Sequence, residues 1–144
     1  LPHLFWTPDI FICNGWQSAM VPGMFKKHYD GINQFYKNIK TVMVIHDLSE
    51  FSLMPRKDLE AAEVPIDKSL KGDNLNIYDV ASFEADAIII FDKPSQNISK
   101  KLLKQPGISK NKNKVSLINW SSDEDPDYIA ITNEIDQVIK KLSA

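Results

Sequence analysis

Four short runs of branched apolar residues limit the folds that this chain can adopt. They cover residues 9–13, 41–46, 86–91 and 115–118. Each run is almost continuously apolar, which is typical of strands that are covered on both faces in a parallel sheet. Segments with helical patterns alternate with these runs. The sequence therefore predicts an α/β fold, a parallel sheet with flanking helices and right-handed crossovers.

Three segments are predicted to be helical. Apolar residues recur at helical spacing over residues 16–28, which indicates an amphipathic helix. Pro22 interrupts this pattern, so the segment can also form two short turns that meet at Pro22. Residues 95–104, ended by Pro106, and residues 132–142 are the other two predicted helices.

Two stretches do not fit the alternation of strands and helices. Residues 48–76 are polar and contain prolines at 55 and 65, so we expect a long functional loop, a small lid or a poorly ordered insertion. Residues 100–114 carry six lysines, which are either a phosphate-binding patch or a solvated helix and loop. The second interpretation is favoured because lysine is mostly a surface residue.

Length and composition predict one domain over residues 1–144. Apolar residues make up 43% and charged residues 25% of the 144, which are globular averages. A net charge of −2 argues against nucleic acid and anionic membranes as partners, and no apolar run reaches the ~20 residues of a membrane span. The single cysteine, Cys13, cannot form an internal disulfide, which fits the cytoplasm.

Several sequence motifs of known chemistry are missing. The five glycines are scattered, which excludes the Gly-rich dinucleotide motif and the P-loop. The three histidines are scattered as well, and we expect neither a metal site nor a bound cofactor. No nucleophile elbow occurs, which weakens a hydrolase hypothesis. Asp47 and Asp92 follow predicted strands and suggest a phosphoacceptor pocket, but a helix cap or turn is the favoured interpretation.

The ends of the first two predicted strands carry the candidate site, because ligands of open α/β sheets bind at the carboxyl ends of the strands. Asn14, Trp16 and Gln17 follow the first strand, and His46 and Asp47 end the second. Amide, imidazole and carboxylate groups could bind hydroxyl or phosphate oxygens there. Each residue also has a structural alternative: Trp16 as a buried anchor, Asn14 as a helix N-cap and His46 as a histidine bonded to backbone.

The same segments, in order, resemble bacterial glycogen and starch synthases. Residues 6–22 resemble P-D-I-I-H-C-H-D-W-Q-T-A-L-V-P, and residues 40–48 are similar to K-T-V-F-T-I-H-N-L. Residues 85–91 resemble A-D-K-V-T-T-V, and residues 114–119 look like K-L-S-G-I-L-N. Four motifs in the family's order make the resemblance specific, although no single motif would.

The resemblance implies the later portion of the N-terminal, Rossmann-like half of a GT-B glycosyltransferase. Such enzymes transfer glucose from ADP-glucose or UDP-glucose to an α-1,4-glucan with retention and without an essential metal. Asn14 stands at the position of the family's second motif histidine, which would face the transferred sugar, and Gly15 stands at its aspartate. Asp47 stands at its asparagine. The candidates for binding the sugar or its donor are therefore Asn14, Trp16, Gln17, His46, Asp47 and Asn119, and none is assigned as catalytic.

The resemblance also places the family's K-x-G-G-L donor loop before Leu1 and its second domain after Ala144. We therefore expect a short, diverged member that does not transfer glucose by itself. A non-catalytic module that binds a sugar nucleotide or a glucan is the alternative, and an α/β interaction domain without a ligand is a third. A sheet without its first strand leaves an edge for an upstream segment or a second copy of the chain, which would make a homo-oligomer.

Overall fold

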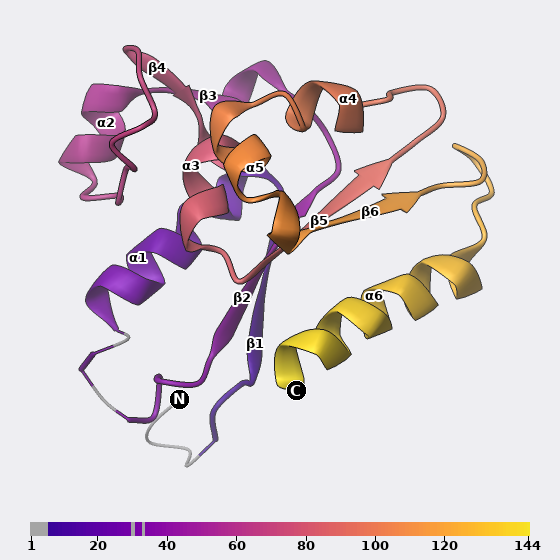
Figure 1. Ribbon diagram of the computed structural model, residues 1–144, viewed down its shortest axis with the longest axis horizontal. Helices are drawn as coiled ribbons and strands as arrows, with labels where there is room; N and C mark the ends of the chain where they lie inside the picture. Colours follow the sequence, from indigo (N-terminus) through magenta and orange to yellow (C-terminus); the bar gives the residue numbers. More distant parts are fainter. Residues whose placement is uncertain (1–5, 30, 33) are drawn as a thin grey trace.

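The computed structural model describes residues 6–29, 31, 32 and 34–144 (Figure 1). Leu1, at which the chain begins, and His3, one of the three histidines, lie outside the described residues. No helix in these described ranges combines the length and the apolar character that crossing a membrane requires.

A four-stranded sheet forms the centre of the molecule. Its strands are β1 (Ile10–Asn14), β2 (Lys40–Ile45), β5 (Ala87–Asp92) and β6 (Val115–Asn119), in the order β1-β2-β5-β6. All three neighbouring pairs are parallel, which confirms the predicted parallel sheet. Because the strands are parallel, their carboxyl ends lie along one edge of the sheet.

One face of the sheet, called the first face below, carries most of the helices (Figure 1). Met43, Ile45, Ile88 and Ile90 point into this face and are completely buried. The elements that pack there are the 3-10 helix η2 (Trp16–Ser18) and helices α1 (Val21–His28), α3 (Ile77–Glu84), α4 (Ser99–Leu102) and α5 (Pro106–Lys110).

The second face of the sheet packs against α6 (Tyr128–Ser143), which contacts β5 and β6. The helix begins where Asp127 accepts hydrogen bonds from two backbone amides of its first turn. Ile131 and Val138 of α6 join a second apolar cluster with Val44 of the sheet. The prediction that the strands are covered on both faces is thus right for the central strands. It is wrong for β1, where Ile12 is 58% exposed.

Two prolines begin helices rather than breaking or ending them. The segment 16–28 does divide in two, but the division falls at Ala19 and Met20, and Pro22 lies in the first turn of α1. Pro106 likewise begins α5 after the predicted helix 95–104 has shortened to α4. Proline suits the first turn because its missing N–H would have no partner within the helix.

Residues 48–76 contain regular structure. They form η3 (Glu50–Ser52), β3 (Leu53–Pro55), α2 (Arg56–Ala61) and β4 (Asn74–Asn76), and β3 pairs antiparallel with β4. This small ribbon leads directly into α3, a buried helix that the sequence patterns did not identify. Asn76 ends β4 and caps α3, because its side chain accepts a hydrogen bond from the amide of Tyr78.

The lysines between residues 100 and 114 lie on the surface, as the favoured interpretation predicts. The exception is Lys114, which ends the 3-10 helix η4 (Lys112–Lys114) and is half-buried. Its Nζ donates to the carbonyls of Ser82 and Phe83 in the last turn of α3. Burial lowers the pKa of Lys114 from its ordinary value. This lysine therefore closes a helix end.

Candidate functional site

The carboxyl ends of β1 and β2 lie side by side and bring the predicted residues of both ends together. Asn14, the last residue of β1, pairs with Val44 of β2. Gly15 follows with φ +74°, a conformation that favours glycine, and its amide donates to the carbonyl of Val44 at 3.0 Å. This bond holds the turn after β1 against the end of β2.

Gly15 also leaves room for two polar side chains to lie close to its backbone. A Cβ atom on Gly15 would lie 2.9 Å from Gln17 Oε1 and 3.2 Å from His46 Nε2. Any larger residue would therefore displace at least one of these groups. We call Trp16, Gln17, His46 and Asp47 the strand-end cluster, because they lie around this glycine.

His46 and Asp47 lie beside a buried tyrosine. The side chains of His46 and Asp47 are 42% and 39% exposed, and Nδ1 of the imidazole lies 3.8 Å from Oδ2 of the carboxylate. The hydroxyl of Tyr78 donates to Asp47 Oδ1 at 3.2 Å. Burial, and then the negative charge of Asp47, raise the pKa of Tyr78 far above its ordinary value, so the hydroxyl remains a donor.

Trp16 is both an anchor and part of the rim of the site. Its ring is half-buried and packs against the first-face core. The ring also stacks on Phe51 of η3, with centroids 5.9 Å apart and an interplanar angle of 29°. Because Phe51 is 63% exposed, the pair presents an apolar surface to solvent beside the polar groups of the cluster.

The structure does not bring Asn14 to the strand-end cluster. Side chains alternate along a strand, so Asn14 faces the second face while Cys13 is buried in the first. Asn14 lines an apolar groove of about 210 Å³ with residues such as Ile12 of β1 and Ile135 of α6. Nor is Asn14 an N-cap, because Gly15 precedes η2 and no side chain caps it.

Asn119 is also separate from the cluster. It ends β6 and pairs with Asp92 of β5. Because β6 lies two strands away from β2, the ends of these two strands are about 10 Å apart at the usual strand spacing. Asp92 is buried and binds α4: its carboxylate accepts from the amide of Ile98 at 2.8 Å and from the hydroxyl of Ser99. Asp92 therefore caps the start of α4, as the favoured interpretation predicts, and of the two carboxylates in the phosphoacceptor hypothesis only Asp47 is left partly exposed.

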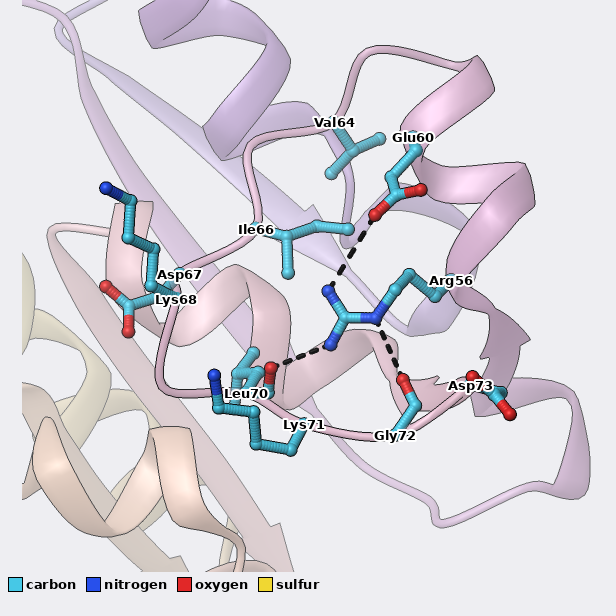
Figure 2. A pocket seen from close by; sticks show the side chains of 10 residues that line it. All are labelled: Arg56, Glu60, Val64, Ile66, Asp67, Lys68, Leu70, Lys71, Gly72 and Asp73. Carbon is cyan, nitrogen blue, oxygen red and sulfur yellow. Dashed lines mark hydrogen bonds and ion pairs between the residues drawn. The ribbon is translucent and has the colours of Figure 1, made fainter.

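A separate hollow of about 650 Å³ lies beside α2 (Figure 2). Its lining contains three cationic and three acidic side chains. Arg56, at its centre, donates to the carbonyls of Gly72 at 2.8 Å and Leu70 at 2.7 Å, and its Nη1 lies 3.9 Å from Glu60 Oε1. The guanidinium therefore fixes the loop before β4, and its bonds are directed to the chain itself.

The chemistry available at the strand-end cluster is that of hydroxyl recognition. Gln17 can donate and accept, Asp47 accepts, and His46 can do either according to its tautomer. Within the described ranges, no group of three or more His, Cys, Asp or Glu side chains is placed to hold a metal ion. The cluster thus suits a neutral, hydroxyl-rich ligand with an apolar face.

Two residues of the site, Phe51 and Tyr78, were not found by the sequence interpretation. Gly15 was expected to allow a tight turn after the first strand, and its positive φ agrees with that expectation. Phe51 lies in the polar segment 48–76, and Tyr78 lies in the helix that was not predicted. The signal available in the sequence for the start of α3 was Asn76, since asparagine is common at helix N-caps and here accepts from the amide of Tyr78.

Comparison with known proteins gives consistent matches. Residues 1–105 match the family model of the starch synthase catalytic domain. A glycogen synthase from Lachnospira eligens is 31% identical over 93 residues, which cover 65% of this chain and 19% of the relative. Glycogen synthases from Alkaliphilus metalliredigens and Clostridium perfringens are 44% and 50% identical over 59 and 48 residues, covering 41% and 33% of this chain and 12% and 10% of the relatives. The chain thus spans less than a fifth of the length of each relative.

Proposed function

Because the chain belongs to the starch synthase catalytic domain family, we propose that its strand-end cluster binds the glucosyl unit of a sugar nucleotide or an α-1,4-glucan. The observation that carries this proposal is the convergence of Gln17 and His46 over Gly15. All three residues lie within the part of the chain that matches the family model. The Rossmann-like α/β fold is that of a glycosyltransferase domain, in which ligands bind at this edge of the sheet.

The arrangement of the cluster fits a glucose ring. A sugar presents hydroxyl groups at its rim and carbon-bound hydrogens on its faces. Gln17, His46 and Asp47 supply donors and acceptors for the rim, and they are partly exposed before any ligand binds. The stacked pair of Trp16 and Phe51 supplies an apolar surface for a face of the ring.

We propose that a longer parent protein transfers glucose as a GT-B enzyme of glycogen biosynthesis in the cytoplasm. In such a transfer the bond from C1 to the diphosphate breaks and a bond from C1 to an acceptor hydroxyl forms, while the hydroxyl proton passes to the departing diphosphate. The departing diphosphate gains negative charge and requires positive groups. Within the strand-end cluster, His46 alone can become cationic. We therefore expect these 144 residues to bind sugar without transferring it.

The position of Asn14 favours a second candidate, a non-catalytic binding module. In the related motif this position holds the histidine that would face the transferred sugar. Here Asn14 faces the groove beside α6, away from His46 and Asp47. A chain that retains the recognition groups but directs this residue elsewhere has the properties of a binding domain.

Isothermal titration calorimetry with ADP-glucose, UDP-glucose and maltotetraose tests the binding proposal. We expect the wild-type chain to bind at least one of these ligands and His46→Ala to weaken that binding about two- to tenfold, as the loss of one hydrogen bond implies. His28→Ala is the matched control, because His28 lies at the end of α1 and contacts Glu63. Absence of binding by the wild type, or equal losses in both variants, rejects the proposal.

A transfer assay separates the enzyme from the binding module. Labelled ADP-glucose and maltotetraose are incubated with the chain, and elongated glucan is counted. We expect counts at the level of a blank without protein. Donor-dependent elongation by these residues alone would show that the cluster supports transfer without further chain.

A further inference from the structure

Tyr78 is buried in the first-face core, yet its hydroxyl reaches the solvent-exposed site. The whole residue is 0% exposed and belongs to the same apolar cluster as Met43 and Ile45. A tyrosine that only filled this core could bond to any nearby backbone carbonyl. Its hydroxyl instead donates to Asp47 Oδ1, in a carboxylate that is 39% exposed.

The start of α3 is held firmly, which gives this hydroxyl a fixed direction. Asn76 accepts from the amide of Tyr78 at 2.9 Å and donates from Nδ2 to Ser52 Oγ at 3.3 Å. Ser52 Oγ in turn donates to the carbonyl of Ser49 at 2.7 Å. These bonds tie the helix to η3 and to the segment that follows Asp47, so the phenol and the carboxylate are held by one network.

The two oxygens of Asp47 face different partners. Oδ1 accepts from Tyr78, and Oδ2 lies 3.8 Å from His46 Nδ1. The other ring nitrogen of His46, Nε2, lies over Gly15 in the middle of the cluster. A carboxylate next to Nδ1 favours a proton on that nitrogen, which leaves Nε2 as an acceptor.

We infer that Tyr78 is a positioning residue of the strand-end cluster: its hydroxyl fixes Asp47 so that its negative charge stays near Nδ1 of His46, which favours a proton on Nδ1 and leaves an unprotonated Nε2 facing the ligand. This inference rests on the proposed function for its ligand, a glucosyl hydroxyl that donates to Nε2. Its structural part is independent of any ligand. Asp47, in the segment after β2, and Tyr78, in α3, are the two titratable groups through which it acts.

Nitrogen-15 NMR of the ligand-free chain tests the inference, because long-range correlations distinguish the two neutral tautomers of a histidine. In the wild type we expect His46 to carry its proton mainly on Nδ1. Tyr78→Phe keeps the ring and removes the hydroxyl, and we expect the share of the Nδ1–H form to fall at least about twofold. His28 serves as an internal reference whose signals stay unchanged.

A second variant shows whether Tyr78 acts through Asp47. Asp47→Asn alone should reduce the Nδ1–H share, and Tyr78→Phe should cause no further fall in the Asp47→Asn background. If Tyr78→Phe does not fold, Asp47→Ala, at a half-exposed position, must still reduce that share. An unchanged tautomer in Tyr78→Phe, or in Asp47→Ala where that variant is needed, overturns the inference.

Affinity measurements keep the inference distinct from the proposed function. With maltotetraose or ADP-glucose as the probe, Tyr78→Phe should weaken binding at least about twofold, since the apparent affinity falls with the share of molecules in which Nε2 is an acceptor. A tautomer shift in a chain that binds neither probe supports the positioning of His46 and rejects the proposed function. Binding of equal strength in the wild type and Tyr78→Phe, together with an unchanged tautomer, retains the function and overturns the inference.

Discussion

The face of the sheet that meets α1, α3, α4 and α5 is closed more completely than the face that meets α6. On the first face, Ile45 and Ile90 have no exposed surface. On the second face, Val44 and Val138 are buried less completely, and Ile12 on β1 is largely exposed. Several short elements cover the first face, whereas on the second face the described elements place α6 over β5 and β6 (Figure 1).

This difference also separates the two groups of candidate residues. Trp16 and Tyr78 belong to the first-face core and extend from it into the strand-end cluster. Asn14 lies on the second face, in the apolar groove beside α6. The stability of the protein and the geometry of the strand-end cluster therefore both depend on the packing of the first-face core. Comparable substitutions on the second face should affect stability and cluster geometry less.

The largest expected effect comes from a cavity in the first face. Ile90→Ala removes a completely buried side chain, which we expect to cost about 2–5 kcal/mol of the free energy of unfolding. Urea unfolding followed by circular dichroism measures the loss. Leu117→Ala, on β6 and 38% exposed, is the control and should cost much less. Equal costs at these two positions, which are register partners on the first face, would contradict the complete closure of that face around Ile90.

The burial of the Cys13 thiol in the first face should make the stability of the protein depend on pH. Burial raises the pKa of Cys13 from 9.0 to about 11. The thiol therefore ionises more readily in the unfolded chain, so the folded state loses stability as the pH rises from 9 toward 11. The loss is at most ~3 kcal/mol, from ~1.4 kcal/mol per pKa unit. Unfolding at pH 8 and pH 10.5 measures it.

Cys13→Ala is the control for this pH effect, because alanine removes the ionisable group from an otherwise similar strand. Its stability should fall less between pH 8 and pH 10.5 than that of the wild type. A parallel decline in both proteins would mean that other groups, and not the buried thiol, cause the alkaline loss.

A smaller effect is expected where α6 meets the second face. Val138→Ala removes two buried methyl groups, which should cost about 1.5 kcal/mol at ~0.8 kcal/mol per group. Urea unfolding measures this cost, and calorimetry with maltotetraose should show unchanged affinity. Gln137→Ala, the exposed neighbour on the same helix, should change stability little. A weaker affinity in Val138→Ala would show that the second face does influence the cluster.

The smallest effect is expected at the exposed edge. Ile12→Ser should change the free energy of unfolding by no more than about 0.5 kcal/mol, as is usual for exposed positions. Ile89→Ser, on the covered part of the same face, should be severely destabilising. Thermal unfolding of both variants measures the two losses of stability. If Ile12→Ser costs as much as Ile89→Ser, the two halves of this face are equally buried in solution.

The sheet could be predicted because each of its strands is marked by a pattern in consecutive residues. Each strand is a run of branched apolar residues, and their near-continuous character indicated parallel pairing. Helix boundaries were less accessible, since Pro22 and Pro106 can end a helix or begin one, and the outcome depends on tertiary packing. Helix α3 was missed because it is apolar on most sides and carries no clear amphipathic pattern.

The site could be predicted only in part. Its location followed from the rule that ligands bind at the carboxyl ends of strands, and Gln17 and His46 do both lie at Gly15, with Asp47 next to His46. Alternation along β1 could have placed Asn14 on the opposite face from Cys13. The contact of Tyr78 with Asp47 joins residues 31 positions apart, so no local pattern indicates it.

The glycine at position 15 has a consequence for how this chain can change over generations. With its positive φ, and with Gln17 Oε1 and His46 Nε2 within 3.2 Å of the place a Cβ would occupy, the position accepts no side chain unless its neighbours move. An aspartate there, as in the related motif, would require new positions for Gln17 and His46 at the same time. The effect of a replacement at 15 therefore depends on the residues at 17 and 46, and we expect substitutions at these three positions to be epistatic.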